Sequence, residues 1–94
     1  MSIEELEALF EALDIWSKIH RGHLTDEPVL GARSPSRKYS DGVSDIVRHR
    51  NAAGYHVATT HRIVLSDGAI PHRHAKDLHI GDIVIRLREE NLPD

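Results

Sequence analysis

The chain contains 94 residues with 12 lysines and arginines, 15 aspartates and glutamates, eight histidines and no cysteine, which gives a formal net charge of −3. This length is enough for one domain with a modest core. The lack of cysteine excludes disulfides, thiolate metal ligands and a cysteine nucleophile, so a metal site would need histidines and carboxylates. The apolar runs are far shorter than the ~20 residues of a membrane span, and the first residues are acidic where a signal peptide is basic. We therefore expect a cytoplasmic protein without a membrane partner.

The charges are unevenly distributed along the chain. Acidic residues dominate residues 1–14 and 77–94, whereas lysine and arginine dominate residues 15–76. The basic middle could attract an anionic partner, but nucleic-acid surfaces usually add aromatic side chains to clustered bases. This chain has one phenylalanine, one tryptophan and two tyrosines. We therefore do not expect it to bind nucleic acid.

The first predicted element is a helix over residues 1–14. Ser2 followed three positions later by Glu5 has the form of a capping box. The apolar residues that follow recur every three or four positions and so share one helical stripe, formed by Ile3, Leu6, Leu9, Phe10 and Leu13. This spacing indicates a helix that packs on a core.

After Asp14 the pattern predicts strands. Residues 15–20 are rich in strand formers, Arg21-Gly22 is a turn signal, and His23-Leu24 begins a return, so we expect a hairpin here. Residues 28–42 are rich in proline, glycine and serine and are predicted to form a mobile loop.

The remainder predicts a series of strands separated by turns. Strands are expected over residues 43–50 and 55–65, joined by a turn at 51–54, with a second turn at Asp67-Gly68. Residues 69–72 are expected to be short and to lie at an edge or bend because of Pro71. Residues 76–79 lead to a turn at Gly81-Asp82, and alternating apolar residues after it predict a last strand. The expected fold is mainly β, in a single domain over residues 1–94.

The segment from Gly54 to Ile85 resembles the histidine block of the Hint module of inteins and hedgehog autoprocessing domains. It places Thr59-Thr60-His61 on a strand and follows it with A-K-D-L-H-I-G-D-I-V. The resemblance implies a Hint-like β-meander or horseshoe with one N-terminal helix. It also implies that His61, helped by Thr59 and Thr60, polarises a scissile peptide bond, and that Asp77, Gly81 and Asp82 form a structural turn.

The function implied by this resemblance is that of an intein fragment. Such a fragment supports protein splicing by activating the upstream peptide bond for an N-to-O or N-to-S acyl shift. It would be an autocatalytic, single-turnover element that needs no cofactor. Its partners would be complementary intein fragments, an N-terminal segment that carries the nucleophile and a C-terminal segment that ends in His-Asn. Alone, the chain could form a homodimer through its open sheet edges.

Two alternatives rest on the histidines. His72 and His74 stand two residues apart, so on a strand they point to one face, and with His79, His61 or Asp77 they could supply three ligands to a divalent metal ion. This pattern favours a small metal-binding β domain. The other alternative is a small ribonuclease toxin in which one histidine is catalytic, and that fold would need a second substantial helix.

Overall fold

The structure is a computed structural model, and it describes residues 1–88. Two helices, α1 (Ile3–Ala12) and α2 (Ile15–His20), precede a six-stranded antiparallel sheet. The strands are β1 (Thr25–Pro28), β2 (Ser34–Pro35), β3 (Val43–Arg50), β4 (His56–Val64), β5 (His72–Ile80) and β6 (Ile83–Arg86), with a 3-10 turn η1 (Leu30–Ala32) after β1. The sheet order is β1-β3-β4-β5-β6, and β2 pairs with β3 beside β1. The mainly β class with a helix at the N-terminus, predicted from the sequence, is confirmed.

Helix α1 forms as its sequence predicts. The Ser2 side chain accepts a hydrogen bond from the Glu5 backbone at 3.2 Å, and the Glu5 carboxylate accepts one from the Ser2 backbone at 3.1 Å. This capping box satisfies two backbone donors at the helix start. Leu6 and Phe10 point from α1 into the core and are fully buried. Within residues 1–88, neither this helix nor α2 is long and apolar enough to cross a membrane.

The hairpin predicted at residues 15–24 is wrong, because residues 15–20 form helix α2. Asp14 adopts a left-handed backbone conformation, with φ 61°, and redirects the chain between the two helices. Ile15 and Ile19, four residues apart, then reach the core from one side of the helix. The strand preference of this short segment is outweighed by the apolar burial that a helix allows here.

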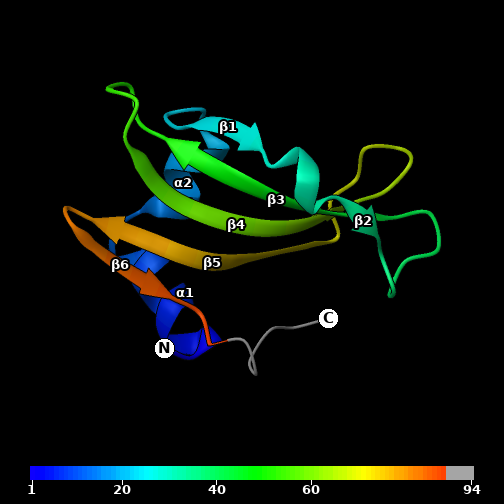
Figure 1. Ribbon diagram of the computed structural model, residues 1–94, viewed down its shortest axis with the longest axis horizontal. Coiled ribbons are helices and arrows are strands. Elements are labelled where there is room, and N and C mark those ends of the chain that lie inside the picture. The colour runs from blue at the N-terminus through cyan, green and yellow to red at the C-terminus, as the bar shows by residue number, and fades with distance from the viewer. Residues whose placement is uncertain (89–94) are drawn as a thin grey trace.

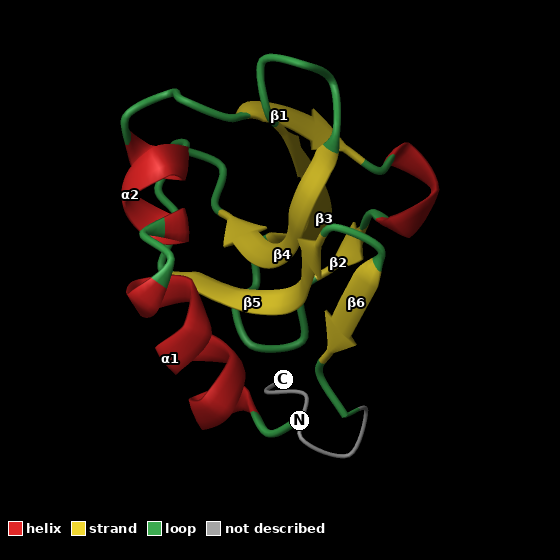
Figure 2. Cartoon of the chain, turned by 90° about the vertical axis from the view of Figure 1, so that its left-hand side faces the viewer, coloured by secondary structure: helices red, strands yellow, loops and turns green. Residues whose placement is uncertain are grey.

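Both helices lie on the same side of the sheet, as the two views in Figure 1 and Figure 2 show. The core fills the space between them and the sheet, and its buried residues are Leu6, Phe10, Ile15, Ile19, Leu24, Ala58, Ala75, Leu78 and Leu87. The side of the sheet that carries Ala58, Ala75 and Leu78 is called the helix face below. The opposite side is called the histidine face.

Strand β5 differs from its prediction. It is a nine-residue inner strand that begins directly after Pro71 and lies between β4 and β6. Of the residues 69–72, predicted to lie at an edge or bend, 69–71 form no strand and precede β5, whereas His72 begins this inner strand. Because His72 is the first residue of β5, Pro71 stands outside the ladder, where its missing N–H costs no strand hydrogen bond.

Two β-bulges decide which side chains share a face. In the pairing of β4 with β5, Thr59 is opposite Asp77 but Thr60 is opposite Ala75, so Lys76 is an extra residue in β5. In the pairing of β3 with β4, the register shifts in the same way and Val57 is the extra residue in β4. A bulge reverses the alternation of side chains beyond it. Consequently, residues three positions apart across each bulge point to the same face of the sheet.

The segment predicted as a mobile loop, residues 28–42, carries η1 and β2 and ends in a close approach of Gly42 to Ile63. A Cβ atom on Gly42 would lie 2.9 Å from Cγ2 of Ile63 and 3.0 Å from Cβ of Tyr39. Only a residue without a side chain fits this approach, since real Cβ contacts are longer. Ile63 is fully buried.

Candidate functional site

The histidine face gathers five of the eight histidines together with Asp77. Cross-strand pairing places His61 opposite His74 and Ile63 opposite His72, so these three imidazoles share the face. The Lys76 bulge adds Asp77 and His79 to the same side, and the Val57 bulge adds His56. Strict alternation would have sent Asp77 to the side opposite His74. The site therefore depends on the two extra residues.

The first cluster, called the three-histidine group, consists of His61, His72 and His74. One ligand nitrogen from each ring can be chosen so that all three lie within 4.8 Å of one another. Nδ1 of His61 is 3.0 Å from Nε2 of His74. The ring centroid of His72 lies 5.4 Å from that of His61 and 5.3 Å from that of His74. The group is largely withdrawn from solvent, because His61 and His74 are buried and His72 is half-buried.

Neighbouring groups fix the proton positions in this cluster. The Nδ1–H of His74 donates to the carbonyl oxygen of Ala75 at 2.9 Å, so the Nε2 of His74 carries a lone pair that faces His61. The other nitrogen of His61, Nε2, lies 2.5 Å from the Ser44 hydroxyl. Burial lowers the pKa of His74, although the hydrogen bond to Ala75 opposes the shift. The ring is therefore neutral near pH 7.

His72 differs from the other two members of the cluster. Its Nε2 is buried and has no hydrogen-bond partner among residues 1–88. A buried polar atom that makes no hydrogen bond costs about 1–3 kcal/mol. The His72 ring offers one ligand nitrogen within 4.8 Å of ligand nitrogens of His61 and His74. A ligand that accepts a nitrogen lone pair would remove the cost.

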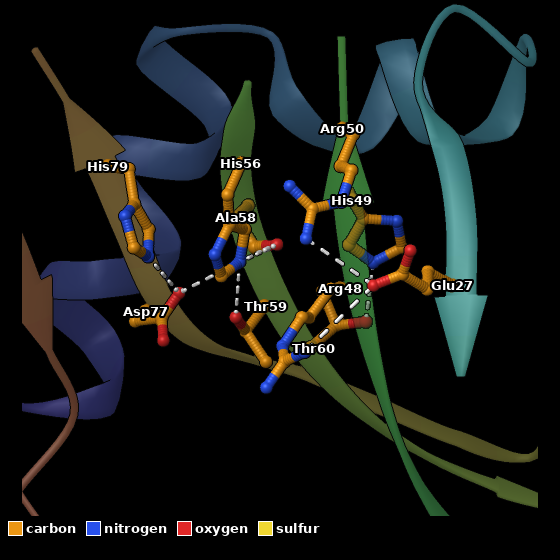
Figure 3. Close-up of polar contacts among 10 residues, drawn as sticks. All are labelled: Glu27, Arg48, His49, Arg50, His56, Ala58, Thr59, Thr60, Asp77 and His79. Atoms are coloured by element: carbon orange, nitrogen blue, oxygen red, sulfur yellow. Dashed lines mark hydrogen bonds and ion pairs between the residues drawn. The ribbon is translucent and has the colours of Figure 1, made fainter. Parts of the chain in front are cut away.

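The second cluster, called the His-Asp-His group, consists of His56, Asp77 and His79, and Figure 3 shows it between β4 and β5. Nε2 of His79 is 3.2 Å from Oδ1 of Asp77, and Nε2 of His56 is 4.0 Å from the same oxygen. The two imidazole rings lie 4.0 Å apart between centroids. Burial and the neighbouring His79 lower the pKa of His56. All three residues are half-buried, so the group is reached more readily by solvent than the three-histidine group.

The structure does not bring the predicted catalytic residues Thr59, Thr60 and His61 together. The Thr59 hydroxyl lies 2.8 Å from Nε2 of His56, in the His-Asp-His group. Thr60 points to the helix face, where its hydroxyl lies 2.8 Å from Nε2 of the buried His49. His61 alone of the three belongs to the three-histidine group.

The predicted turn residues and metal ligands are also only partly grouped as expected. Gly81 occupies the β5–β6 turn with φ 58°, a conformation that favours glycine, and Asp82 follows it in the same turn. Asp77 lies within β5 instead, where it pairs with Arg86. Of the alternative metal ligands, His72 and His74 are joined by His61, whereas His79 belongs to the other cluster.

Sequence reasoning missed Ser44 and His56 as members of the two clusters. Ser44 is the second residue after the loop of residues 28–42 and stands opposite Ile63, and nothing in its neighbours singles it out. His56 lies three residues before Thr59, so alternation alone would place it on the helix face. The Val57 bulge that reverses this has no glycine or proline to mark it.

Comparison of the chain with protein-family models, curated proteins and solved structures finds no match. The candidate function therefore rests on the geometry of the two clusters.

Proposed function

We propose that the chain binds a divalent transition-metal ion, with Zn²⁺ preferred, through His61, His72 and His74. The observation that carries the proposal is the buried Nε2 of His72, which has no hydrogen-bond partner among residues 1–88, on a ring that offers one ligand nitrogen within 4.8 Å of ligand nitrogens of His61 and His74. Two nitrogens of these last two rings are only 3.0 Å apart. Zn–N bonds of 2.0–2.1 Å at tetrahedral angles place ligand nitrogens about 3.3 Å from one another. The separation of the His61 and His74 nitrogens is close to this value.

The groups around the two paired rings support the same arrangement. Metal-binding histidines usually donate their second ring N–H to a carbonyl, a carboxylate or water, which fixes the orientation of the ring. His74 already donates its Nδ1–H to Ala75. With an ion on Nδ1 of His61, its proton would reside on Nε2 and donate to the Ser44 hydroxyl, which lies 2.5 Å away. Both rings can thus ligate an ion without losing their outer contacts.

Three imidazoles leave a fourth tetrahedral position for water or a substrate atom. Zinc sites with three protein ligands and one open position are typical of catalytic zinc, because the ion lowers the pKa of the bound water to about 7. Imidazole ligands suit Zn²⁺, Cu²⁺ and Ni²⁺ better than Mg²⁺ or Ca²⁺. With an ion bound, the three-histidine group would therefore support metal-assisted hydrolysis.

The test is a Zn²⁺ titration of the full chain with the variants His72→Ala and His23→Ala. His23 is exposed and lies outside both clusters, so it serves as the control. A ligand at 100 times its dissociation constant stabilises the folded state by about 2.7 kcal/mol. For a domain of this size that free energy raises the midpoint of thermal unfolding by roughly 11–22 °C. The wild type and His23→Ala should show this shift.

His72→Ala should lose most of the Zn²⁺-dependent shift, measured against the thermal midpoint of the same variant without metal. Co²⁺ substitution adds an independent readout, since a tetrahedral Co²⁺ site with three nitrogens absorbs strongly in the visible range. A His72→Ala variant that responds to Zn²⁺ as the wild type does would overturn the proposal. So would a wild type whose unfolding is insensitive to Zn²⁺.

The splicing function implied by the sequence resemblance stays a prediction and is kept as a second proposal. It is supported by the resemblance of the segment from Gly54 to Ile85, which carries His61, the histidine expected to polarise the scissile peptide bond. Its test supplies the complementary N-terminal and C-terminal peptides in the presence of EDTA. Spliced or cleaved product, slowed about 10²–10⁴-fold by His61→Ala, would support splicing. The ribonuclease alternative lacks its second substantial helix within residues 1–88, since α2 has six residues.

A further inference from the structure

We propose that the His-Asp-His group is a second divalent-cation site, separate from the three-histidine group, and that it prefers ions that accept oxygen ligands, such as Mn²⁺ and Fe²⁺. Two imidazoles from β4 and β5 and one carboxylate from β5 supply the ligand atoms. Carboxylate ligands favour harder ions than imidazole or thiolate do. The two clusters on the histidine face should therefore select different metals.

The distances in the group fit such an ion after a small side-chain movement. Metal–ligand bonds of about 2.1 Å place neighbouring ligand atoms ~3.0–3.4 Å apart in octahedral or tetrahedral geometry. Nε2 of His79 lies 3.2 Å from Oδ1 of Asp77, within this range. Nε2 of His56 lies 4.0 Å from the same oxygen, so rotation of this half-buried ring must close the remaining gap.

A cavity next to the group leaves room for the rest of the coordination shell. Its volume is about 450 Å³, within the range of small-ligand sites. Its lining residues are Asn51, Tyr55, His56, Val57, His79, Gly81 and Asp82. Asp77 is not among them, so the two imidazoles border the cavity while the carboxylate lies to the side of it. Positions that the three residues leave vacant on an ion would be taken by water or by a small ligand with oxygen donors.

Charges of both signs surround the group. Asp77 and Asp82 bring two carboxylates to the group and its cavity, while Arg50 acts electrostatically on His56 and Arg86 stands opposite Asp77. In the metal-free protein, the Nε2–H of His56 donates to the Ala58 carbonyl at 3.0 Å, and the Nε2–H of His79 donates to Asp77. Both protons must leave Nε2 before these nitrogens can ligate an ion.

The experiment titrates Mn²⁺ into the ¹⁵N-labelled full chain and follows the paramagnetic broadening of amide signals. In the wild type the strongest broadening should centre on the amides of His56, Asp77 and His79. Asp77→Asn keeps the shape of the side chain but removes its charge, and it should weaken Mn²⁺ binding more than about 100-fold, beyond the 10–100-fold typical of outer-shell changes. Asp67→Asn, the same substitution in the β4–β5 turn, should bind Mn²⁺ as the wild type does.

Two further variants separate this proposal from the zinc site. His79→Ala should abolish the broadening even if Asp77→Asn proves poorly folded, while His72→Ala should leave it intact. Loss of Zn²⁺ binding in His72→Ala with Mn²⁺ binding preserved would show two independent sites. The proposal is overturned if Asp77→Asn and His79→Ala bind Mn²⁺ like the wild type. It is equally overturned if the broadening centres on His61, His72 and His74.

Discussion

Glu7 joins helix α1 to the bulged strand, and its replacement by alanine should destabilise the fold strongly. One carboxylate oxygen accepts the backbone N–H of Ala75 at 2.8 Å, directly beside the Lys76 bulge, and the other accepts the indole N–H of Trp16 at 2.7 Å. Ala75 is 0% exposed, so water does not reach its N–H while the carboxylate is in place. Leaving such a donor unpaired costs about 1–3 kcal/mol, and the lost charge-assisted bond to the half-buried indole adds roughly 1 kcal/mol.

The expected loss in the free energy of unfolding for Glu7→Ala is therefore about 2–4 kcal/mol. For a domain of this size it corresponds to a fall in the thermal midpoint of roughly 10–30 °C. Urea unfolding followed by far-UV circular dichroism measures it without relying on Trp16, whose surroundings the substitution changes. The control is Glu11→Ala, an exposed glutamate one turn further along the same helix, which should stay within ~0.5 kcal/mol of the wild type. Equal stability of the two variants would refute this account of Glu7.

Two other perturbations test the packing and the buried histidines. Gly42→Ala should destabilise the protein by about 1–3 kcal/mol, because the new Cβ would lie 2.9 Å from Ile63. The control Gly31→Ala should not destabilise it, because its Cβ meets nothing within 4 Å. Equal thermal midpoints for the two variants would contradict the predicted clash. Burial lowers the pKa of His49 despite its bond to Asp26, so the folded state binds fewer protons than the unfolded state below pH ~6.5. The free energy of unfolding should therefore fall from pH 7 to pH 5 in urea titrations, and His49→Gln should show a shallower decline.

The sequence predicts most of the sheet because its strands carry local signals. Strand β3 begins and ends where the alternation of residues 43–50 places it, and the turns at Gly54 and Gly68 have positive φ angles, as their glycines indicate. Helix α2 could not be predicted in the same way. Its six residues favour strands locally, and the deciding interaction is the burial of Ile15 and Ile19 against residues far along the chain.

The membership of the two clusters was harder to predict than the strands. The pair His72 and His74 follows from a two-residue spacing, and it does share a face. His61 joins that pair because it stands opposite His74 in β4. Whether Asp77 and His79 share the face depends on the Lys76 bulge, which neither the lysine nor its neighbours signal. In the same way, the face on which His56 lies depends on the Val57 bulge, which the sequence does not signal. A reading that assumes strict alternation therefore separates side chains that the fold brings together.

The two bulge residues, Val57 in β4 and Lys76 in β5, affect how the sequences of related proteins should be compared. A protein that lacked the residue equivalent to Lys76 could keep every histidine and still turn His72 and His74 towards the helices, because a one-residue deletion reverses the facing of all preceding positions in the strand. Conversely, one residue inserted into a strand could bring histidines from the two sides of a sheet onto the same face. The length of β5 between His74 and Asp77 is thus as informative about metal binding as the identity of the histidines themselves.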